Sequence, residues 1–276
     1  KPMNLFEWAR HIDVVTWDSY PDPDAGVPVG AALNHDLFRS LKGGQPFLLM
    51  EQASSHTQWR TVNRLKPPGV MRLWSYQAIA HGADGVLFFQ WRASRAGAEK
   101  YHSGMIGQTG DASSRVFREV VRLGQELRLL PDLADARTQA PAAIVYDWDN
   151  WWALEIDGKP NNHVTYMELI HAYYGALHRL NVQVDFVRPD GDWSGYKLVV
   201  APTLYMMGEE TARRMEAFAE RGGTIVTTMF SGAVDAFDRI HPDGVGSPLR
   251  ALIGARLEEI DALPPEAQRQ LEAKIQ

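Results

Sequence analysis

Short apolar runs alternate with amphipathic segments along the first half of the chain, and this alternation limits the possible fold more than any other feature. The apolar runs lie at residues 13–17, 47–51 and 85–91. Nearly continuous apolar runs of this length are typical of strands that are buried on both faces. Segments with the apolar spacing of helices lie at residues 31–41, 70–81 and 114–130. The order strand–helix, repeated three times, predicts a parallel sheet that is covered by helices.

A segment at residues 131–141 begins and ends with proline and has the composition of a linker, and the alternation restarts after it. Strands are expected at residues 142–146, 182–187, 197–201 and 223–229, and helices at residues 163–180 and 208–221. This order predicts a doubly wound, flavodoxin-like α/β domain. We therefore expect a first domain at 1–138 and a second domain at 139–276. The second domain is expected to be incomplete at its C-terminus and to contain further helix within 257–275.

The composition excludes several classes of protein. The chain has 276 residues, of which 45% are hydrophobic and 22% are charged, as in a globular protein. A formal net charge of -6 without a cluster of Lys or Arg argues against nucleic acid and a membrane surface as partners. The apolar runs are also far shorter than the ~20 residues of a membrane span. The absence of Cys excludes disulfides, thiolate metal sites and Cys nucleophiles.

Acidic and aromatic residues follow the strands of the first half, at the end of the sheet where a parallel α/β barrel has its active site. Glu51 comes directly after an apolar run, so its carboxylate is expected to be held in a fixed position. A glycosidase nucleophile needs such an ionised carboxylate, fixed against the anomeric carbon. The alternative is a strand-end acid that caps a loop. Trp59 is a candidate platform for a sugar ring or, alternatively, an aromatic side chain that packs the loop.

The long loop after the third strand contains Glu99 and His102, which can accept and donate hydrogen bonds to sugar hydroxyls. The spacing Glu-x-x-His also occurs in di-metal carboxylate proteins, which need a second such motif and further Glu ligands. The sequence contains no second motif of this kind, so we expect no metal. Motifs for nucleotide cofactors and for serine hydrolases are absent as well, and no cofactor is expected.

Three further features of the sequence are interpreted as structural contacts. Arg92 is expected to form an ion pair with a strand-end acid such as Asp18 or Glu51, with a direct substrate contact as the alternative, and Trp91 is expected to serve packing. The segment Asp-Trp-Asp-Asn-Trp-Trp at 147–152 is predicted to be a loop after the first strand of the second domain. A flavodoxin-like domain binds ligands in such a loop, but aromatic packing fits this composition better because a phosphate-cradling Gly/Ser pattern is missing.

Two regions of the first half resemble the β-galactosidases of glycoside hydrolase family 42. The sequence FLLMEQ at 47–52, followed by Trp59 and by PGVMRLW at 68–74, looks like the nucleophile region of that family. The sequences FFQWRA at 88–93 and GAEKYH at 97–102 resemble its eighth barrel strand and its galactose-binding loop. The resemblance implies that the first domain corresponds to strands six to eight of a (β/α)₈ barrel.

The resemblance continues through residues 147–155 into the second domain of the family, which mediates homotrimer formation in these enzymes. It implies that the chain corresponds to the C-terminal part of such an enzyme, that is, the end of the barrel and most of the trimerisation domain. It also implies a homotrimer in the parent enzyme, a β-galactoside as substrate and, as a tendency of the family, a cytoplasmic location.

The same resemblance implies a retaining β-galactosidase in which Glu51 is the nucleophile. The positions that contact galactose in the family correspond to Trp59, Phe89, Glu99 and His102, and Tyr20 is expected to line the same subsite. The general acid/base of the family is a Glu in an Asn-Glu pair, and this dipeptide does not occur in the chain. Retaining hydrolysis needs two carboxyl groups. The sequence therefore predicts that the chain alone does not hydrolyse β-galactosides at a useful rate.

Two other hypotheses remain at this point. The chain can be a non-catalytic module that only self-associates through residues 141–276. It can also be a free-standing flavodoxin-like binding protein, although that reading needs cofactor loops that the sequence does not show.

Overall fold

The computed structural model describes residues 3–25, 28–134, 136–156 and 158–264. Its contacts divide the chain into two compact units. The first consists of Lys1–Ala140 and Leu177–Phe186, and the second consists of Pro141–Ala176 and Val187–Gln276. The division near residue 140 lies close to the boundary that we predict at 138/139. The grouping of Leu177–Phe186 with the first unit has no counterpart in the prediction.

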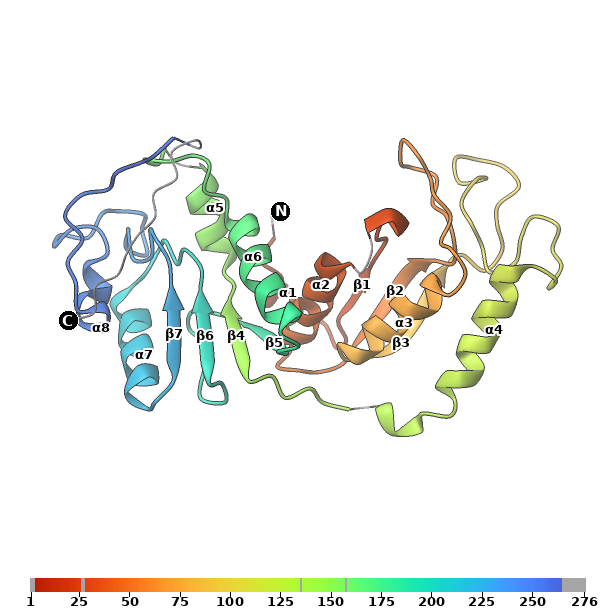
Figure 1. Ribbon diagram of the computed structural model, residues 1–276, viewed down its shortest axis with the longest axis horizontal. Coiled ribbons are helices and arrows are strands. Elements are labelled where there is room, and N and C mark those ends of the chain that lie inside the picture. The colour runs from red at the N-terminus through yellow and green to blue at the C-terminus, as the bar shows by residue number, and fades with distance from the viewer. Residues whose placement is uncertain (1–2, 26–27, 135, 157, 265–276) are drawn as a thin grey trace. The chain divides into compact units, whose positions relative to one another are not determined.

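The first unit contains a three-stranded parallel sheet in the order β1-β2-β3 (Figure 1). Its strands are β1 (Thr16–Asp18), β2 (Phe47–Ala53) and β3 (Ala83–Phe89), and they are followed by α2 (Val29–Ser40), α3 (Val70–Ala80) and α4 (Arg115–Leu127). Shorter elements are α1 (Leu5–Ala9), η1 (Pro23–Ala25) and η2 (Pro131–Leu133). The predicted order of strand and helix is confirmed, and it is that of a partial (β/α)₈ barrel.

Helices α2 and α3 pack on one face of this sheet, and α4 packs beside α3. Phe47 and Leu49 of β2 are buried there, and α3 buries Met71, Trp74 and Ala78, which recur at helical spacing. Burying a large apolar side chain completely contributes about 1.5–3 kcal/mol. These contacts hold the end of β2, and with it Glu51, against a rigid support.

The opposite face of the sheet carries Leu48, Met50 and Leu87. Successive side chains of a strand point to opposite faces, and the register that pairs Leu48 with Gly85 places Met50 and Leu87 on the same face. Met50 is 37% exposed and Leu87 is 42% exposed. In a complete barrel this face points to the interior and is filled by side chains from all the strands. Within the described residues the sheet has three strands, and this face is open.

The strands after residue 140 form a four-stranded sheet in the order β5-β4-β6-β7; β4, β6 and β7 belong to the second unit, and Figure 1 shows them side by side. The strands are β4 (Ala142–Val145), β5 (Val184–Val187), β6 (Leu198–Ala201) and β7 (Thr224–Thr227). The helices are α5 (Trp148–Ile156), α6 (Tyr166–Arg179), α7 (Glu209–Glu220) and α8 (Arg250–Ile253), with the 3₁₀ turn η3 (Ser247–Leu249). The parallel pairs β4–β6 and β6–β7 and the crossover order agree with the flavodoxin-like prediction.

The structure differs from the predicted elements in two places. Residues 148–156 form helix α5, not a loop, and Trp148 is buried with its ring centroid 4.6 Å from that of Tyr146. Residues 257–264 contain no helix, and the remainder of the helix expected within 257–275 lies outside the described residues. No helix in the described parts of the chain is both long enough and apolar enough to cross a bilayer.

Candidate active site

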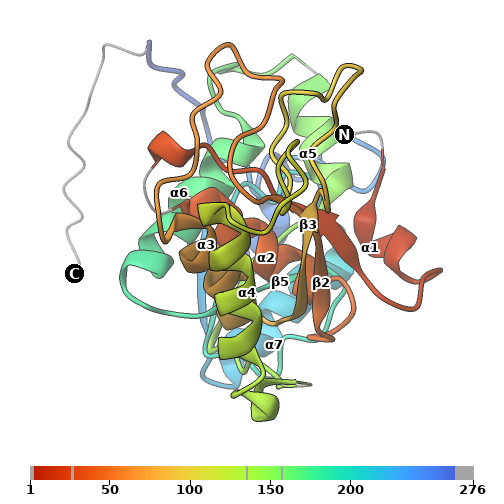
Figure 2. The same cartoon turned by 90° about the vertical axis from the view of Figure 1, so that its right-hand side faces the viewer.

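Glu51 lies near the carboxyl end of β2, where the ladder is irregular. The register between β2 and β3 shifts between Leu49 and Gln52, and Glu51 is opposite Asp18 of β1. The backbone N–H of Ser19 donates to the carbonyl of Glu51 at 2.8 Å, which extends the pairing beyond the strand. Figure 2 shows the loops that follow β2 and β3, in orange and yellow, extending from the same end of the sheet. The site is therefore at the end that the barrel rule predicts.

The hydroxyl of Tyr20 donates a hydrogen bond to the Glu51 carboxylate, with 2.6 Å between Oη and Oε2. Hydrogen bonds to an ionised acceptor are short and strong. Burial raises the pKa of the Tyr20 phenol, and the hydrogen bond to Glu51 and the charges of Glu51, Asp18 and Glu99 raise it further. Tyr20 therefore stays a proton donor. Among the described residues no hydrogen bond reaches the other oxygen, Oε1 of Glu51, so one carboxylate oxygen is held and the other is available.

Four aromatic rings form a cluster that includes Tyr20, the hydrogen-bond partner of this carboxylate. The Trp59 ring packs edge-on against Tyr20 with 4.8 Å between centroids, and its centroid lies 5.4 Å from that of His102. Phe89 packs edge-on against His102 at 4.9 Å. Trp59 is nevertheless 53% exposed. An indole that is held by two neighbouring rings but is about half exposed can still stack on the C–H face of a sugar.

His102 is fully buried, and its two ring nitrogens have different surroundings. Nδ1 lies 2.8 Å from the carbonyl oxygen of Ser103, so Nδ1 carries the proton and donates. Nε2 is then an acceptor, and it has no hydrogen-bond partner among the described residues. Buried polar atoms without a partner are rare in folded proteins. The unpartnered Nε2 therefore fits a ligand that supplies a hydroxyl.

The structure places the other predicted residues differently. Glu99 is exposed, and its backbone carbonyl accepts from the N–H of His102 at 2.9 Å, so its carboxylate is near the cluster but not bonded to it. The predicted ion pair of Arg92 is wrong, because its guanidinium donates to the carbonyl of Gln108 at 3.3 Å. Arg92 lies beyond β3, where an isolated bridge to Ile106 turns it toward its own loop. Trp91, which is expected to serve packing, is 65% exposed in this structure.

Two basic residues of the loop after β2 belong to the site, although they carry no recognisable motif. Arg60 donates to the backbone carbonyl of Tyr20, and its Nε lies 3.9 Å from the Asp22 carboxylate. Lys66 is buried, and its Nζ donates to the carbonyl of Ala53 and to Oε1 of Gln52. Single basic residues in a polar loop give no local signal, so sequence reasoning missed both.

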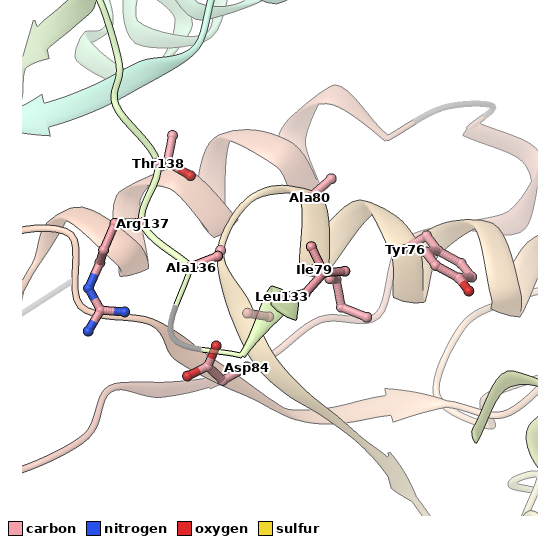
Figure 3. Close-up of a pocket in the computed structure, with 10 residues that line it drawn as sticks. Tyr76, Ile79, Ala80, Asp84, Leu133, Ala136, Arg137 and Thr138 are labelled. Carbon is pink, nitrogen blue, oxygen red and sulfur yellow. The ribbon is translucent and has the colours of Figure 1, made fainter. Parts of the chain in front are cut away.

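A separate pocket lies at the other end of β3 (Figure 3). It has a volume of about 290 Å³ and lies between α3 and the segment after η2, next to Ala83 and Asp84 at the start of the strand. None of the predicted site residues lines it. A larger hollow of about 620 Å³ lies beside Tyr20 and Asp18, between the end of β1 and the start of α2. No group of three possible metal ligands occurs in the part of the chain that the structure describes.

Comparison with known protein families gives two adjoining matches. Residues 1–130 match the family model described as "Beta-galactosidase", and residues 140–275 match "Beta-galactosidase trimerisation domain". The β-galactosidase BgaB of Geobacillus sp. (strain Y412MC61) is 52% identical over 264 residues, which are 96% of this chain and 39% of that protein. The β-galactosidase LacZ of Heyndrickxia coagulans is 48% identical and covers 98% of this chain and 41% of its own length. The chain thus spans about two fifths of these relatives.

Solved structures agree with these matches. The crystal structure of a β-galactosidase from Bacillus circulans sp. alkalophilus has a TM-score of 0.91 and 47% sequence identity, over 96% of this chain and 39% of that one. Gan42B, a GH42 β-galactosidase, has a TM-score of 0.88 and 37% identity, over 95% of this chain and 39% of that one. The chain therefore belongs to the β-galactosidases of glycoside hydrolase family 42 and corresponds to their C-terminal part.

Proposed function

We propose that this chain carries the nucleophile and a large part of the galactose-binding subsite of a retaining β-galactosidase. The observation that carries the proposal is the Tyr20–Glu51 hydrogen bond, together with the aromatic cluster that Tyr20 forms with Trp59, His102 and Phe89. A carboxylate that is oriented by a neutral donor and bordered by exposed aromatic surface fits a sugar site better than a loop cap.

In the proposed reaction, Oε1 of Glu51 attacks C1 of the galactoside. The C1–Oε1 bond forms while the bond from C1 to the leaving oxygen breaks, and a general acid protonates that oxygen. Water then cleaves the galactosyl-enzyme and releases galactose with retained configuration. The Tyr20 hydroxyl keeps the carboxylate in the direction of attack. Trp59 stacks on the sugar, and Nε2 of His102 accepts a hydrogen bond from a sugar hydroxyl.

The acid/base is proposed to come from outside this sequence. The family uses a Glu in an Asn-Glu pair, and the 276 residues contain no such pair. General acid catalysis contributes about 10²–10⁴-fold to the rate. We therefore expect that the chain alone releases little nitrophenol from a nitrophenyl β-galactoside.

The test uses a chimera in which this chain replaces the matching 264 residues of the Geobacillus BgaB. A slow substrate, 2,4-dinitrophenyl 2-deoxy-2-fluoro-β-galactoside, traps the nucleophile because the dinitrophenolate leaves without a proton and the fluorine slows hydrolysis of the intermediate. We expect one fluorogalactosyl group on the peptide that contains Glu51 and no label in E51Q. Glu99→Gln is the matched control, because it removes a carboxylate of the same subsite and should weaken binding but still permit labelling. Labelling of another residue, or of E51Q at the same rate, contradicts the proposal.

A second candidate function is self-association through the second unit, which the match to a trimerisation domain favours. This function is compatible with the first. Light scattering on the purified chain is expected to give about three times the 31.0 kDa of the monomer. A monomer at tens of micromolar contradicts it.

A further inference from the structure

Lys66 is a buried amine without a carboxylate partner. It is 2% exposed, and the described residues include no ion pair of Lys66. Its Nζ donates to Oε1 of Gln52 at 3.0 Å and to the carbonyl of Ala53, and it lies 4.7 Å from the centroid of the Trp74 ring. An ammonium group has three N–H donors, and these two oxygens and the ring face take all three. Burial and the positive charge of Arg60 lower the pKa of Lys66 to about 7.

A buried amine is costly, and an apolar side chain of similar length would avoid that cost. Polar groups that break this rule are found where they fix a functional geometry. The two groups that Lys66 binds therefore point to its role. They are the side-chain oxygen of Gln52 and the backbone carbonyl oxygen of Ala53, the two residues that follow Glu51 in the chain.

The first of these oxygens controls the direction of Glu51. The amide of Gln52 accepts from Lys66 and donates through Nε2 to Oγ of Ser75 at 2.7 Å, and that hydroxyl donates to a backbone carbonyl of α3 at 2.8 Å. Neighbouring side chains on a strand point to opposite faces, so fixing Gln52 on the helix side directs Glu51 to the other side. The ladder register shifts just before Gln52, and backbone pairing alone does not fix this residue.

The second oxygen, the carbonyl of Ala53, joins the two ends of the loop that carries Trp59. The loop leaves the sheet after Ala53 and returns at Lys66, so this hydrogen bond closes its stem. The backbone of Lys66 is itself held, because Nη2 of Arg115 at the start of α4 donates to its carbonyl at 3.2 Å. Arg60, within the loop, is the other charged group that acts on the amine.

We propose that Lys66 is a positioning residue that sets the Glu51 carboxylate and the Trp59 ring relative to each other by clamping Gln52 and Ala53. The proposal rests on the function proposed above for Glu51. It assigns Lys66 no contact with the substrate. Removing its donors should release the loop stem and misplace both groups, and a misplacement of about 1 Å costs about 10²-fold in rate.

The first measurement is hydrogen exchange on the 276-residue chain without sugar. In Lys66→Met, amides at 54–65 should exchange at least about tenfold faster, while those of α7 in the second unit stay unchanged. The matched control is Lys42→Met, because Nζ of Lys42 also donates to two backbone carbonyls, those of Ala9 and Ile12, but outside the site. This control should leave 54–65 protected.

The chain also permits a rescue, because it contains no cysteine. Lys66→Cys offers a single thiol, and bromoethylamine converts it in denaturant to an isostere of lysine that carries the amine on a thioether. After refolding, the aminoethylated protein should regain protection at 54–65, whereas the unmodified Cys variant should not. Failure of the amine to restore protection overturns the clamp.

The second measurement uses the chimera with BgaB. Lys66→Met should lower the rate constant of fluorogalactosyl trapping at saturation by about 10–100-fold and raise KM, with the folded fraction taken into account. Lys42→Met should change neither. A trapping rate within twofold of the parent, or a loss that follows only the folded fraction, overturns the proposal. The proposed roles of Glu51 and Lys66 can be refuted separately. Labelling of E51Q would refute Glu51 as the nucleophile, whereas the exchange measurement would still test whether Lys66 clamps Gln52 and Ala53.

Discussion

Protonation of His35 is expected to destabilise the first unit at acid pH. The His35 side chain of α2 is 2% exposed, with its ring stacked on Phe47 at 5.5 Å and edge-on to Trp17 at 4.9 Å between centroids. Burial and, to a smaller extent, the neighbouring His81 lower the pKa of His35 to about 3 against the opposing effect of Asp36. The unfolded chain binds this proton near its ordinary pKa of 6.5.

The magnitude follows from the difference between these two pKa values. Below 6.5 the unfolded state is protonated at His35 and the native state is not, so stability is lost as the pH falls from 6.5 toward 3. One pKa unit corresponds to about 1.36 kcal/mol, and His35 should lower the free energy of unfolding by about 2 kcal/mol between about pH 7.5 and pH 5. That loss is a large part of the free energy of unfolding of a typical domain, which is about 5–15 kcal/mol.

The assay is urea denaturation at about pH 7.5 and about pH 5. The free energy of unfolding of the first unit is followed through hydrogen exchange of the α2 peptide. His35→Phe retains the aromatic contacts but cannot titrate, so its free energy of unfolding should depend on pH less than that of the parent by about 2 kcal/mol. Phe47→Leu is the control, because it disturbs the same ring stack and should lower stability equally at both pH values. If the His35→Phe and parent chains lose the same stability at acid pH, the burial argument is refuted.

Three further substitutions test the site and the core. Tyr20→Phe removes the hydrogen bond to Glu51, worth about 1.5–3 kcal/mol for an ionised acceptor, and should slow trapping in the chimera about 10–100-fold in stopped-flow assays. Gly104→Ala would place a Cβ 2.4 Å from the backbone nitrogen of Ala93, so calorimetry should show a lower unfolding temperature and less galactose binding by the chimera. Arg39→Met removes the buried ion pairs with Asp36 and Asp185 and should lower the urea-derived stability by about 3–5 kcal/mol.

The sequence predicted the strands and helices of the first unit because their signals are local. An apolar run before Glu51 and an apolar period in α3 each suffice to define an element. Helix α5 was missed because Trp and Asn dominate its first turns, and the burial of Trp148 that accompanies the helix is a tertiary contact without a local signal. The expected ion pair of Arg92 failed for a related reason, since nothing local shows that its loop turns the guanidinium away from the strand ends.

The contacts within the site also divide into those with a local sequence signal and those that only the fold brings together. The position of Glu51 follows from its strand, whereas the hydrogen bond from Tyr20 crosses from the end of β1 to the end of β2 and needs the sheet register. Lys66 is the extreme case, because its partners are 13 and 14 residues away and lie under a helix. A lone lysine in a polar loop is typically solvated, so only the fold shows that it is buried.

The groups that hold Glu51 all belong to the three β/α units of this chain, and this limits what a further part of the barrel has to supply. The hydroxyl of Tyr20 and the amide of Gln52 are in place without it. The open face with Met50 and Leu87 is different, because exposed apolar area there costs about 25 cal/mol for each Å² that a complete barrel would bury. Covering this face would therefore add stability, whereas the contacts that orient the Glu51 carboxylate are already present within this chain.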